Sequence, residues 1–204
     1  MPRPEKFTTS ELLDAAREAV AAHGRQVTLA QIATQAHAPI GSLYHRFASR
    51  EELLAQLWLR SIGRFHTALL AVIEQATNPH EALVETAVAV GAYCRANPSE
   101  AEAMTLYRQA HLAATGPETL REQASHINDA IFAQLAELTY AHYGRANDEQ
   151  LALVRTAVVE LPYGLLRPCI GAHIPDELDR IIRAATSAVL NIGQQHHRQQ
   201  RNHQ

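Results

Sequence analysis

The sequence has few cysteines and no long apolar run. Cys94 and Cys169 are its two cysteines among 204 residues, too few for a disulfide framework and without the paired spacing of a structural zinc site. The longest uncharged stretches contain Gln, Thr and His, and no basic segment followed by an apolar run comes after Met1. This pattern predicts neither a signal peptide nor a membrane span. We therefore expect a soluble protein of the cytoplasm with no membrane partner.

Motifs for metal binding and catalysis are also lacking. The 12 histidines include no His-x-x-x-His or His-Glu-x-x-His pattern, and His196, His197 and His203 fall in a polar tail where solvated side chains are the expected state. There is no nucleophile motif and no phosphate-binding loop. We expect no metal, no cofactor and no enzymatic activity. An enzyme built on a helical scaffold is the less favoured alternative.

The small net charge of -3 is unevenly distributed along the chain. Residues 1–66 hold eight basic and six acidic side chains, whereas the remainder holds ten basic and fifteen acidic ones. The N-terminal part is therefore mildly positive and the rest negative. This asymmetry favours a polyanionic partner at the N-terminal end.

The apolar residues have helical spacing throughout, and no run alternates with a period of two for long enough to form a strand. Caps, glycines and prolines divide the chain into an all-α fold of about nine helices. The expected helices cover 9–23, 28–36, 39–47, 49–77, 79–96, 98–114, 117–143, 148–166 with a kink at Pro162, and 176–193.

The segment from Thr28 to Arg50 reads TLAQIATQAHAPIGSLYHRFASR. It predicts two short helices separated by a tight turn at 35–38, preceded by one helix and followed by a long one. This is the pattern of a helix-turn-helix, in which the second short helix enters the major groove of DNA.

Residues 28–54 resemble the DNA-binding head of the TetR/AcrR family of bacterial transcriptional regulators. The matching residues are Thr28, Ile32, Ala33, Gly41, Ser42, Leu43, Tyr44, Phe47, Ser49, Arg50, Glu51, Glu52, Leu53 and Leu54. The chain departs from the family pattern at His37, where the turn usually carries glycine, and at Pro39, Arg46 and Arg50. His37 must either accept a strained turn conformation or alter the turn.

The resemblance implies a sequence-specific, ligand-responsive DNA-binding regulator. Its expected partners are double-stranded DNA with a palindromic operator, a second copy of itself, and an unknown small-molecule effector. We expect a homodimeric repressor that the effector releases from the operator, and an activator with the same fold is the alternative. The domains expected are a helix-turn-helix head (1–48), a connecting helix (49–77), an effector-binding and dimerisation body (78–193) and a frayed polar tail (194–204).

The chemistry of the side chains divides the expected DNA contacts into two groups. The phosphate contacts expected are Thr28, Tyr44, Arg46 and Arg50. The base contacts expected at the start of the recognition helix are Pro39, Ile40, Gly41, Ser42 and His45. Arg3 and Lys6 are candidates for an N-terminal arm that touches a phosphate or the minor groove.

The body offers candidates for the effector and for the partner copy. The candidate effector-pocket residues, which the spacing equally assigns to the core, are Phe65, Tyr93, Met104, Tyr107, His111, Phe132 and Tyr163. By the resemblance, a four-helix dimer interface is expected from the last two long helices. The interface candidates are Leu165, Leu166, Ile181, Ile182, Ala185 and Val189.

Overall fold

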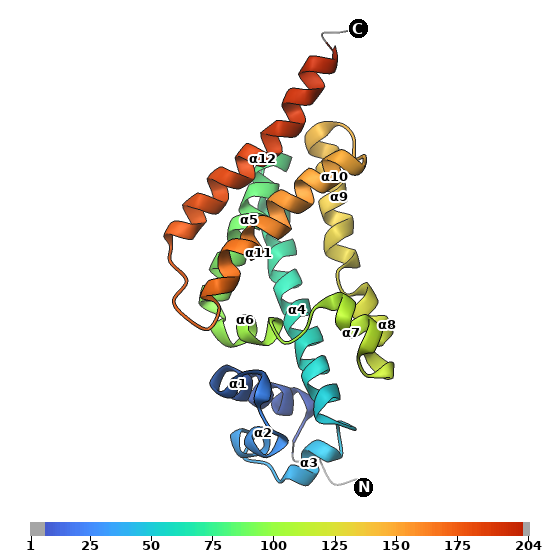
Figure 1. Cartoon of the computed structure of the whole chain (residues 1–204), viewed down its shortest axis with the longest axis vertical. Coiled ribbons are helices and arrows are strands. Elements are labelled where there is room, and N and C mark those ends of the chain that lie inside the picture. The colour runs from blue at the N-terminus through green and yellow to red at the C-terminus, as the bar shows by residue number, and fades with distance from the viewer. Residues whose placement is uncertain (1–6, 202–204) are drawn as a thin grey trace. The chain divides into compact units, whose positions relative to one another are not determined.

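A computed structural model describes the backbone of residues 7–201 and the side chains of residues 7–194 (Figure 1). Every regular element in this part of the chain is a helix, which confirms the all-α prediction. The helices form two compact units. The head unit holds the chain up to Arg64 together with Asn97–Ile127, and the body unit holds Phe65–Ala96 together with the chain from Asn128 onward.

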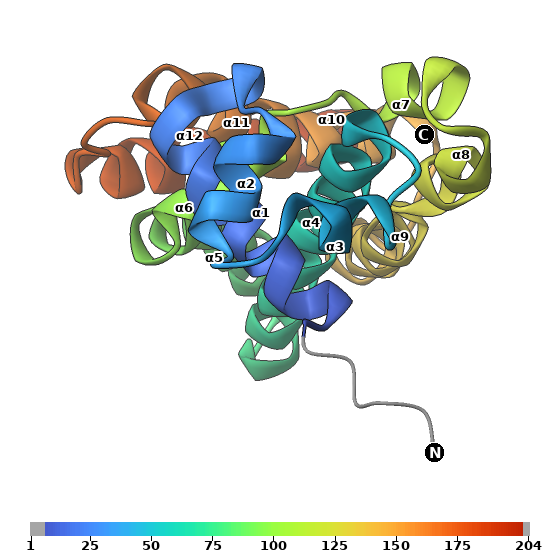
Figure 2. The ribbon, with the colours of Figure 1, turned by 90° about the horizontal axis from the view of Figure 1, so that it is seen from below.

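The head unit contains the N-terminal helices and three short later ones. Its elements are α1 (Thr9–His23), η1 (Gly24–Gln26), α2 (Leu29–Gln35), α3 (Ile40–Tyr44), the beginning of α4 (Arg50–Gln75), α6 (Pro98–Met104), α7 (Gln109–Thr115) and α8 (Glu118–His126). Within this unit α2 packs beside α1 and α3, and α7 packs beside α8 (Figures 1 and 2).

The core of the head unit comes from the apolar stripes that the sequence predicts. Leu12 of α1, Ile32 of α2 and Leu53 of α4 are all completely buried in it. Trp58 of α4 packs in the same core and donates from its indole nitrogen to the main-chain oxygen of Met104, at 3.0 Å. This hydrogen bond joins α4 to the end of α6.

The body unit is a bundle of longer helices. Its elements are the remainder of α4, α5 (Pro79–Ala96), α9 (Asp129–Tyr143), α10 (Asp148–Arg155), η2 (Thr156–Glu160), α11 (Leu161–Leu166), η3 (Arg167–Cys169) and α12 (Glu177–Arg201). The backbone of α12 stays helical past residue 194, where the sequence placed the start of a frayed tail. The side chains of His196 and His197, and the whole of His203, lie outside the described residues.

Two of the expected helices are each divided in two. The helix expected over 98–114 is interrupted between α6 and α7, where Leu106 turns into the head core and is 2% exposed. The helix expected over 117–143 breaks between α8 and α9. Ile127 packs against the head core and Ile131 packs in the body core, so the two halves serve different units. Residues 97–127, which the sequence assigned to the body, therefore belong to the head unit.

The turn between α2 and α3 places His37 in the left-handed region, with φ of 49°. The amide of His37 donates to the carbonyl of Thr34 at 3.1 Å, and the amide of Ala38 donates to the carbonyl of Ala33 at 3.0 Å. These two bonds form a Schellman motif, in which the residue at the position of His37 is usually glycine. The strained alternative stated for His37 is therefore the one observed.

His37→Gly is expected to raise the free energy of unfolding by about 1 kcal/mol, because the left-handed conformation strains every residue that has a Cβ atom. Urea denaturation at constant pH measures this change. His37→Ala is the matched control and is expected to give no gain, since alanine keeps the Cβ atom. Equal stability of the glycine and alanine variants would contradict this explanation.

The helix expected to kink at Pro162 contains a π-helical turn just before this residue. In Thr156–Glu160 the hydrogen bonds follow the π pattern, and the amide of Leu161 donates to the carbonyl of Thr156. In this register the carbonyl of Ala157 would pair with the amide of residue 162, which proline lacks. The hydroxyl of Thr186 on α12 donates to that carbonyl instead, at 3.0 Å. The π-helical turn is thus stabilised by a neighbouring helix.

Thr186→Val is expected to lower the free energy of unfolding by about 1–3 kcal/mol, because it leaves the buried carbonyl of Ala157 without a donor. Urea denaturation checks this value. Thr139→Val is the matched control: Thr139 is equally buried, but its hydroxyl donates to the carbonyl of Leu135, which α9 already pairs. The control is expected to cost less than Thr186→Val, and equal costs would rule out a special role for Thr186.

Candidate nucleic-acid interface

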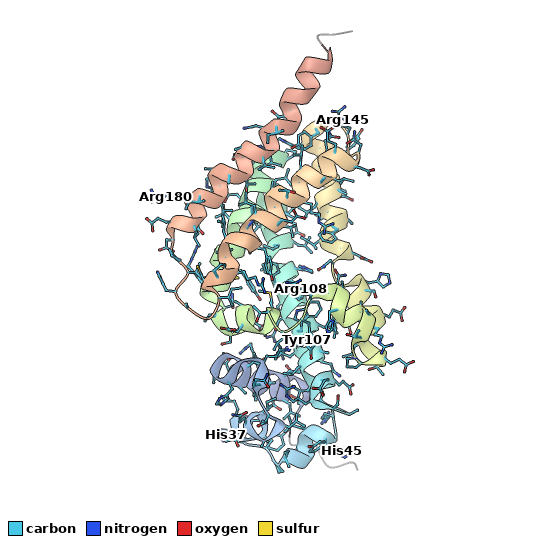
Figure 3. All side chains as sticks on the ribbon, viewed as in Figure 1. His37, His45, Tyr107, Arg108, Arg145 and Arg180 are labelled. Carbon is cyan, nitrogen blue, oxygen red and sulfur yellow. The ribbon has the colours of Figure 1, made fainter. Side chains whose placement is uncertain are left out.

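The second short helix of the helix-turn-helix is α3, and most of its side chains face outward. Leu43 is the buried residue of α3, whereas Ile40 is 43% exposed and Tyr44 is 60% exposed. The accessible positions at and around this helix are Pro39, Ile40, Gly41, Ser42, Tyr44 and His45. Figure 3 shows His37 and His45, which flank α3, on the outer side of the head unit. The residues expected to meet bases are therefore accessible.

Thr28 caps α2 as expected, but its hydroxyl is already engaged. The hydroxyl accepts from the amide of Gln31 at 3.2 Å and donates to the side-chain oxygen of Gln31 at 2.9 Å. The same oxygen of Gln31 accepts from the amide of Thr28 at 2.8 Å, which completes a capping box. The donor that was expected to reach a phosphate therefore serves the helix start.

Arg46 and Arg50, the two expected phosphate-binding arginines, both bind main-chain carbonyls of the head unit. Arg46 donates to the carbonyl of Phe7 at 2.9 Å. Arg50 donates to the carbonyl of Val27 at 2.6 Å and to that of Arg25, and it forms an ion pair with Glu51 at 3.2 Å. Arg46 thus fixes the chain before α1, and Arg50 fixes η1 against the start of α4. Sequence reasoning missed these structural roles, because nothing in the local sequence identifies the carbonyls.

Another group of arginines forms a charge cluster that joins α1, α4 and α6. At its centre the carboxylate of Glu100, whose side chain is 6% exposed, pairs with Arg64 at 2.6 Å and with Arg17 at 2.9 Å. Asp14 pairs with Arg60 at 3.0 Å in the same cluster. These arginines hold the head unit together and are not a free cationic surface.

The ionisation of Glu100 reflects these partners. Burial raises the pKa of Glu100, but hydrogen bonds from Arg64 and Arg17 outweigh burial and hold the pKa below its ordinary value. The carboxylate is therefore charged at neutral pH.

The seven candidate effector-pocket residues do not form one site. Tyr107 and His111 line a cavity of about 470 Å³ in the head unit, which we call the head cavity. Phe132 lines a smaller, mainly apolar cavity of about 250 Å³ between α9 and α10. The remaining four candidates line neither cavity. Phe65 packs edge-on against Tyr93 with 5.2 Å between ring centroids, the carbonyl of Met104 binds Trp58, and Tyr163 is 50% exposed.

Two of the residues predicted for the dimer interface are buried within the protomer. Leu166 is 1% exposed and Ile182 is completely buried within the protomer, so neither is available to a partner. Ile181, by contrast, is 49% exposed, and Leu165, Ala185 and Val189 are half-buried. The register of an amphipathic helix is hard to assign when both of its faces carry apolar residues.

The accessible apolar face of α11 and α12 also contains residues that the sequence did not single out for a dimer. Tyr163 and Ile192 are 50% and 45% exposed, and Ala184 and Ala188 are exposed between Ile181 and Ile192 on α12. Their spacing places the α12 residues on one side of that helix.

Within the described residues there is no group of three or more histidine, cysteine, aspartate or glutamate side chains placed to hold a metal ion. None of the described helices has the length and apolar character needed to cross a membrane.

Comparison with known proteins agrees with this architecture. Residues 12–57 match the family model described as "Bacterial regulatory proteins, tetR family". The HTH-type transcriptional regulator BetI of Brucella suis is 30% identical over 182 residues, which make up 87% of each chain. BetI of Brucella canis gives the same identity and coverage. The chain belongs to the tetR family. It is therefore a transcriptional regulator with a DNA-binding helix-turn-helix, as the resemblance of residues 28–54 implied.

Solved structures of this tetR-family fold extend the similarity to nearly the whole chain. A transcriptional regulator from Rhodococcus sp. Rha1 has a TM-score of 0.71 at 21% identity, covering 93% of this chain and 97% of that one. FadR from Bacillus subtilis, solved in complex with stearoyl-CoA, has a TM-score of 0.63 at 18% identity, covering 91% and 97% of the two chains. At these identities the likeness concerns the fold.

Proposed function

We propose that this regulator is a homodimeric repressor that places α3 of each protomer in the major groove of a palindromic operator. The observation that carries the proposal is the accessible face of α3, where only Leu43 is turned to the core. In a helix-turn-helix dimer the two recognition helices meet half-sites about one helical turn apart, near 34–36 Å. The apolar rings and methyl groups of Pro39 and Ile40 suit thymine methyls, and Ser42 and His45 offer hydrogen bonds to base edges.

The proposed phosphate contacts differ from those that the sequence suggests. Because Arg46 and Arg50 bind carbonyls of their own unit, we assign them to positioning the head rather than to holding the phosphate backbone. Tyr44 keeps the proposed phosphate role, since its side chain is largely exposed and carries a hydroxyl that can bind a phosphate. The remaining contacts come from the α3 face itself.

Dimerisation is supported by the accessible apolar face of α11 and α12. Isolated exposed apolar residues are normal, but several large ones on adjacent helices favour a protein partner. A second copy that presents the same face forms a closed two-fold pair, which matches a palindromic DNA site. Leu165, Ile181, Ala185 and Val189 stay in the proposed interface, and Leu166 and Ile182 are removed from it.

Responsiveness to a small molecule is supported by the two cavities and by the structural neighbour that holds stearoyl-CoA. An effector that binds the DNA-incompetent conformation more tightly lowers DNA affinity, and DNA lowers effector affinity by the same factor. Helix α4 runs without a break from the head unit into the body unit and is the proposed mechanical connection.

Selection from random duplex DNA at fixed salt tests the DNA-binding proposal. The wild-type protein is expected to enrich a palindromic sequence, and Tyr44→Ala is expected to weaken binding to that sequence by about tenfold or more through loss of a phosphate contact in each protomer. Tyr140→Ala is the matched control, because Tyr140 is 64% exposed on α9 of the body unit. A non-palindromic sequence would contradict the symmetric dimer. Equal binding by the two tyrosine variants would remove Tyr44 from the interface.

The direction of regulation has its own test. A reporter joined to the selected site is expected to rise when the regulator gene is deleted, as for a repressor. A fall would assign the same fold to an activator.

A further inference from the structure

The head cavity lies wholly within the head unit, between the start of α4 and the α7–α8 turn. Its volume of about 470 Å³ lies within the range of small-molecule sites. It is lined by Arg25 of η1, by Ser49, Arg50 and Glu51 at the start of α4, and by residues of the segment 107–117. Two parts of the chain far apart in sequence therefore enclose it.

The guanidinium of Arg25 gives the head cavity a positive charge. The guanidinium of Arg25 lies over the ring of Tyr107, 5.2 Å from its centroid, and forms no ion pair with any carboxylate of the described residues. Arg50 and Glu51, in contrast, pair with one another at 3.2 Å. The start of the long helix α4 adds the positive end of its dipole. The net electrostatic preference of the cavity is thus for a single negative charge.

The segment 107–117 gives the cavity apolar and polar groups together, with Tyr107 and Pro117 beside His111 and Thr115. Leu112 is 1% exposed to solvent, and Pro117 and the ring of Tyr107 are half-buried beside it. Tyr107 and Arg108 are neighbours in the loop between α6 and α7 (Figure 3), but only Tyr107 lines the cavity. Burial raises the pKa of Tyr107, which keeps its hydroxyl protonated and available as a donor at neutral pH.

We propose that the head cavity binds a small monocarboxylate with an apolar ring. The carboxylate accepts from the guanidinium of Arg25, whose planar set of donors suits a carboxylate, and the ring packs on the half-buried Pro117. Because the site contacts η1 and the start of α4 as well as α7, an occupant joins these segments of the head unit. The inference rests on the proposed ligand-responsive function, since it assigns a site and a ligand class to it.

Calorimetric titration of the full-length protein with 3-phenylpropionate, without DNA, tests the proposal. We expect saturable binding of one molecule per protomer. The neutral 3-phenylpropanamide is expected to bind at least about tenfold more weakly, because a charge-assisted hydrogen bond is replaced by an uncharged one. Absence of saturable binding, or equal binding of the acid and the amide, would overturn the proposal.

Variants locate the binding. Arg25→Gln is expected to weaken 3-phenylpropionate binding by about tenfold or more, and Arg25→Lys, which keeps the charge but loses the planar donor set, is expected to lie between it and the wild type. Arg108→Gln removes one exposed positive charge from the same unit without altering the cavity lining and is expected to change the affinity less than about twofold. Equal losses in Arg25→Gln and Arg108→Gln would show general charge attraction and overturn the assigned site. Because no DNA is present, failure of DNA binding and failure of this site are separate results.

Discussion

Leu43→Ala is expected to weaken operator binding by at least about tenfold in a protein that remains folded. Leu43 is completely buried, and it is the buried residue of α3, which has only five residues. A helix this short is not stable by itself and depends on its packing. Removal of a buried leucine side chain costs about 2–5 kcal/mol, and even 1.4 kcal/mol spent on ordering α3 in the complex lowers affinity tenfold.

Fluorescence anisotropy with the selected duplex, at a temperature well below unfolding, measures this loss. Leu12→Ala is the matched control, because Leu12 is equally buried in the same core but lies on α1. Urea denaturation of both variants shows whether their stability losses are similar. If both variants bind the duplex equally well at that temperature, the anchoring role of Leu43 is wrong.

The helices themselves were predictable because their signals are local. The capping box at Thr8 and Glu11 begins α1, and the buried positions of α1 follow the apolar stripe of the sequence. At His37 the sequence left two outcomes open, a strained residue or an altered turn, and the structure shows the left-handed residue. The breaks after Met104 and His126 were not predictable in the same way. They exist because Leu106 and Ile127 pack in the head core, which is a tertiary effect.

In the candidate DNA interface, the exposure of the α3 residues was predictable from the sequence. The binding partners of the arginine side chains were not. The accessible face of α3 follows from one buried residue, Leu43, and from helical periodicity. Helical periodicity does not show which group an arginine side chain binds. Arg46 and Arg50 reach carbonyls more than 20 residues away along the chain, and a sequence motif does not distinguish such a contact from one to a phosphate.

The distribution of arginines also limits how the head attracts DNA. Arg17, Arg60 and Arg64 form ion pairs with Asp14 and Glu100. These pairs largely neutralise the mild positive charge of the N-terminal part within the head unit. Residues 39–45 contain no lysine or arginine. For this reason we expect shape and base contacts at α3 to contribute more to specific affinity than long-range attraction does.

Glu100→Gln is expected to lower the free energy of unfolding by about 2–3 kcal/mol at pH 7. The substitution keeps the size of the side chain but removes the charge that joins Arg17 of α1 to Arg64 of α4. Loss of one partner of a buried ion pair is strongly destabilising because the other charges remain without compensation. The expected value is smaller than the roughly 3–5 kcal/mol typical of such a loss, since the side chains of Arg17 and Arg64 are 23% and 41% exposed and water offsets part of the loss.

The matched control for this variant is Glu102→Gln, which makes the same change on the same helix at a residue outside the cluster. Urea denaturation at pH 7 is expected to show a small effect for the control and a large one for Glu100→Gln. Equal effects would mean that the overall charge of α6, and not the cluster, determines stability.

The pH dependence gives a second and sharper test of the cluster. Because the pKa of Glu100 is lower in the folded protein than in the unfolded chain, its contribution is fully present above the unfolded value, about pH 4.3, and is lost as the pH falls through the folded value. The difference in unfolding free energy between the wild type and Glu100→Gln should therefore be constant from pH 8 to about pH 5.5 and should shrink toward pH 3. A difference that stays the same at every pH would show that the carboxylate charge of Glu100 does not stabilise the head unit, and the cost of the substitution would then be one of packing.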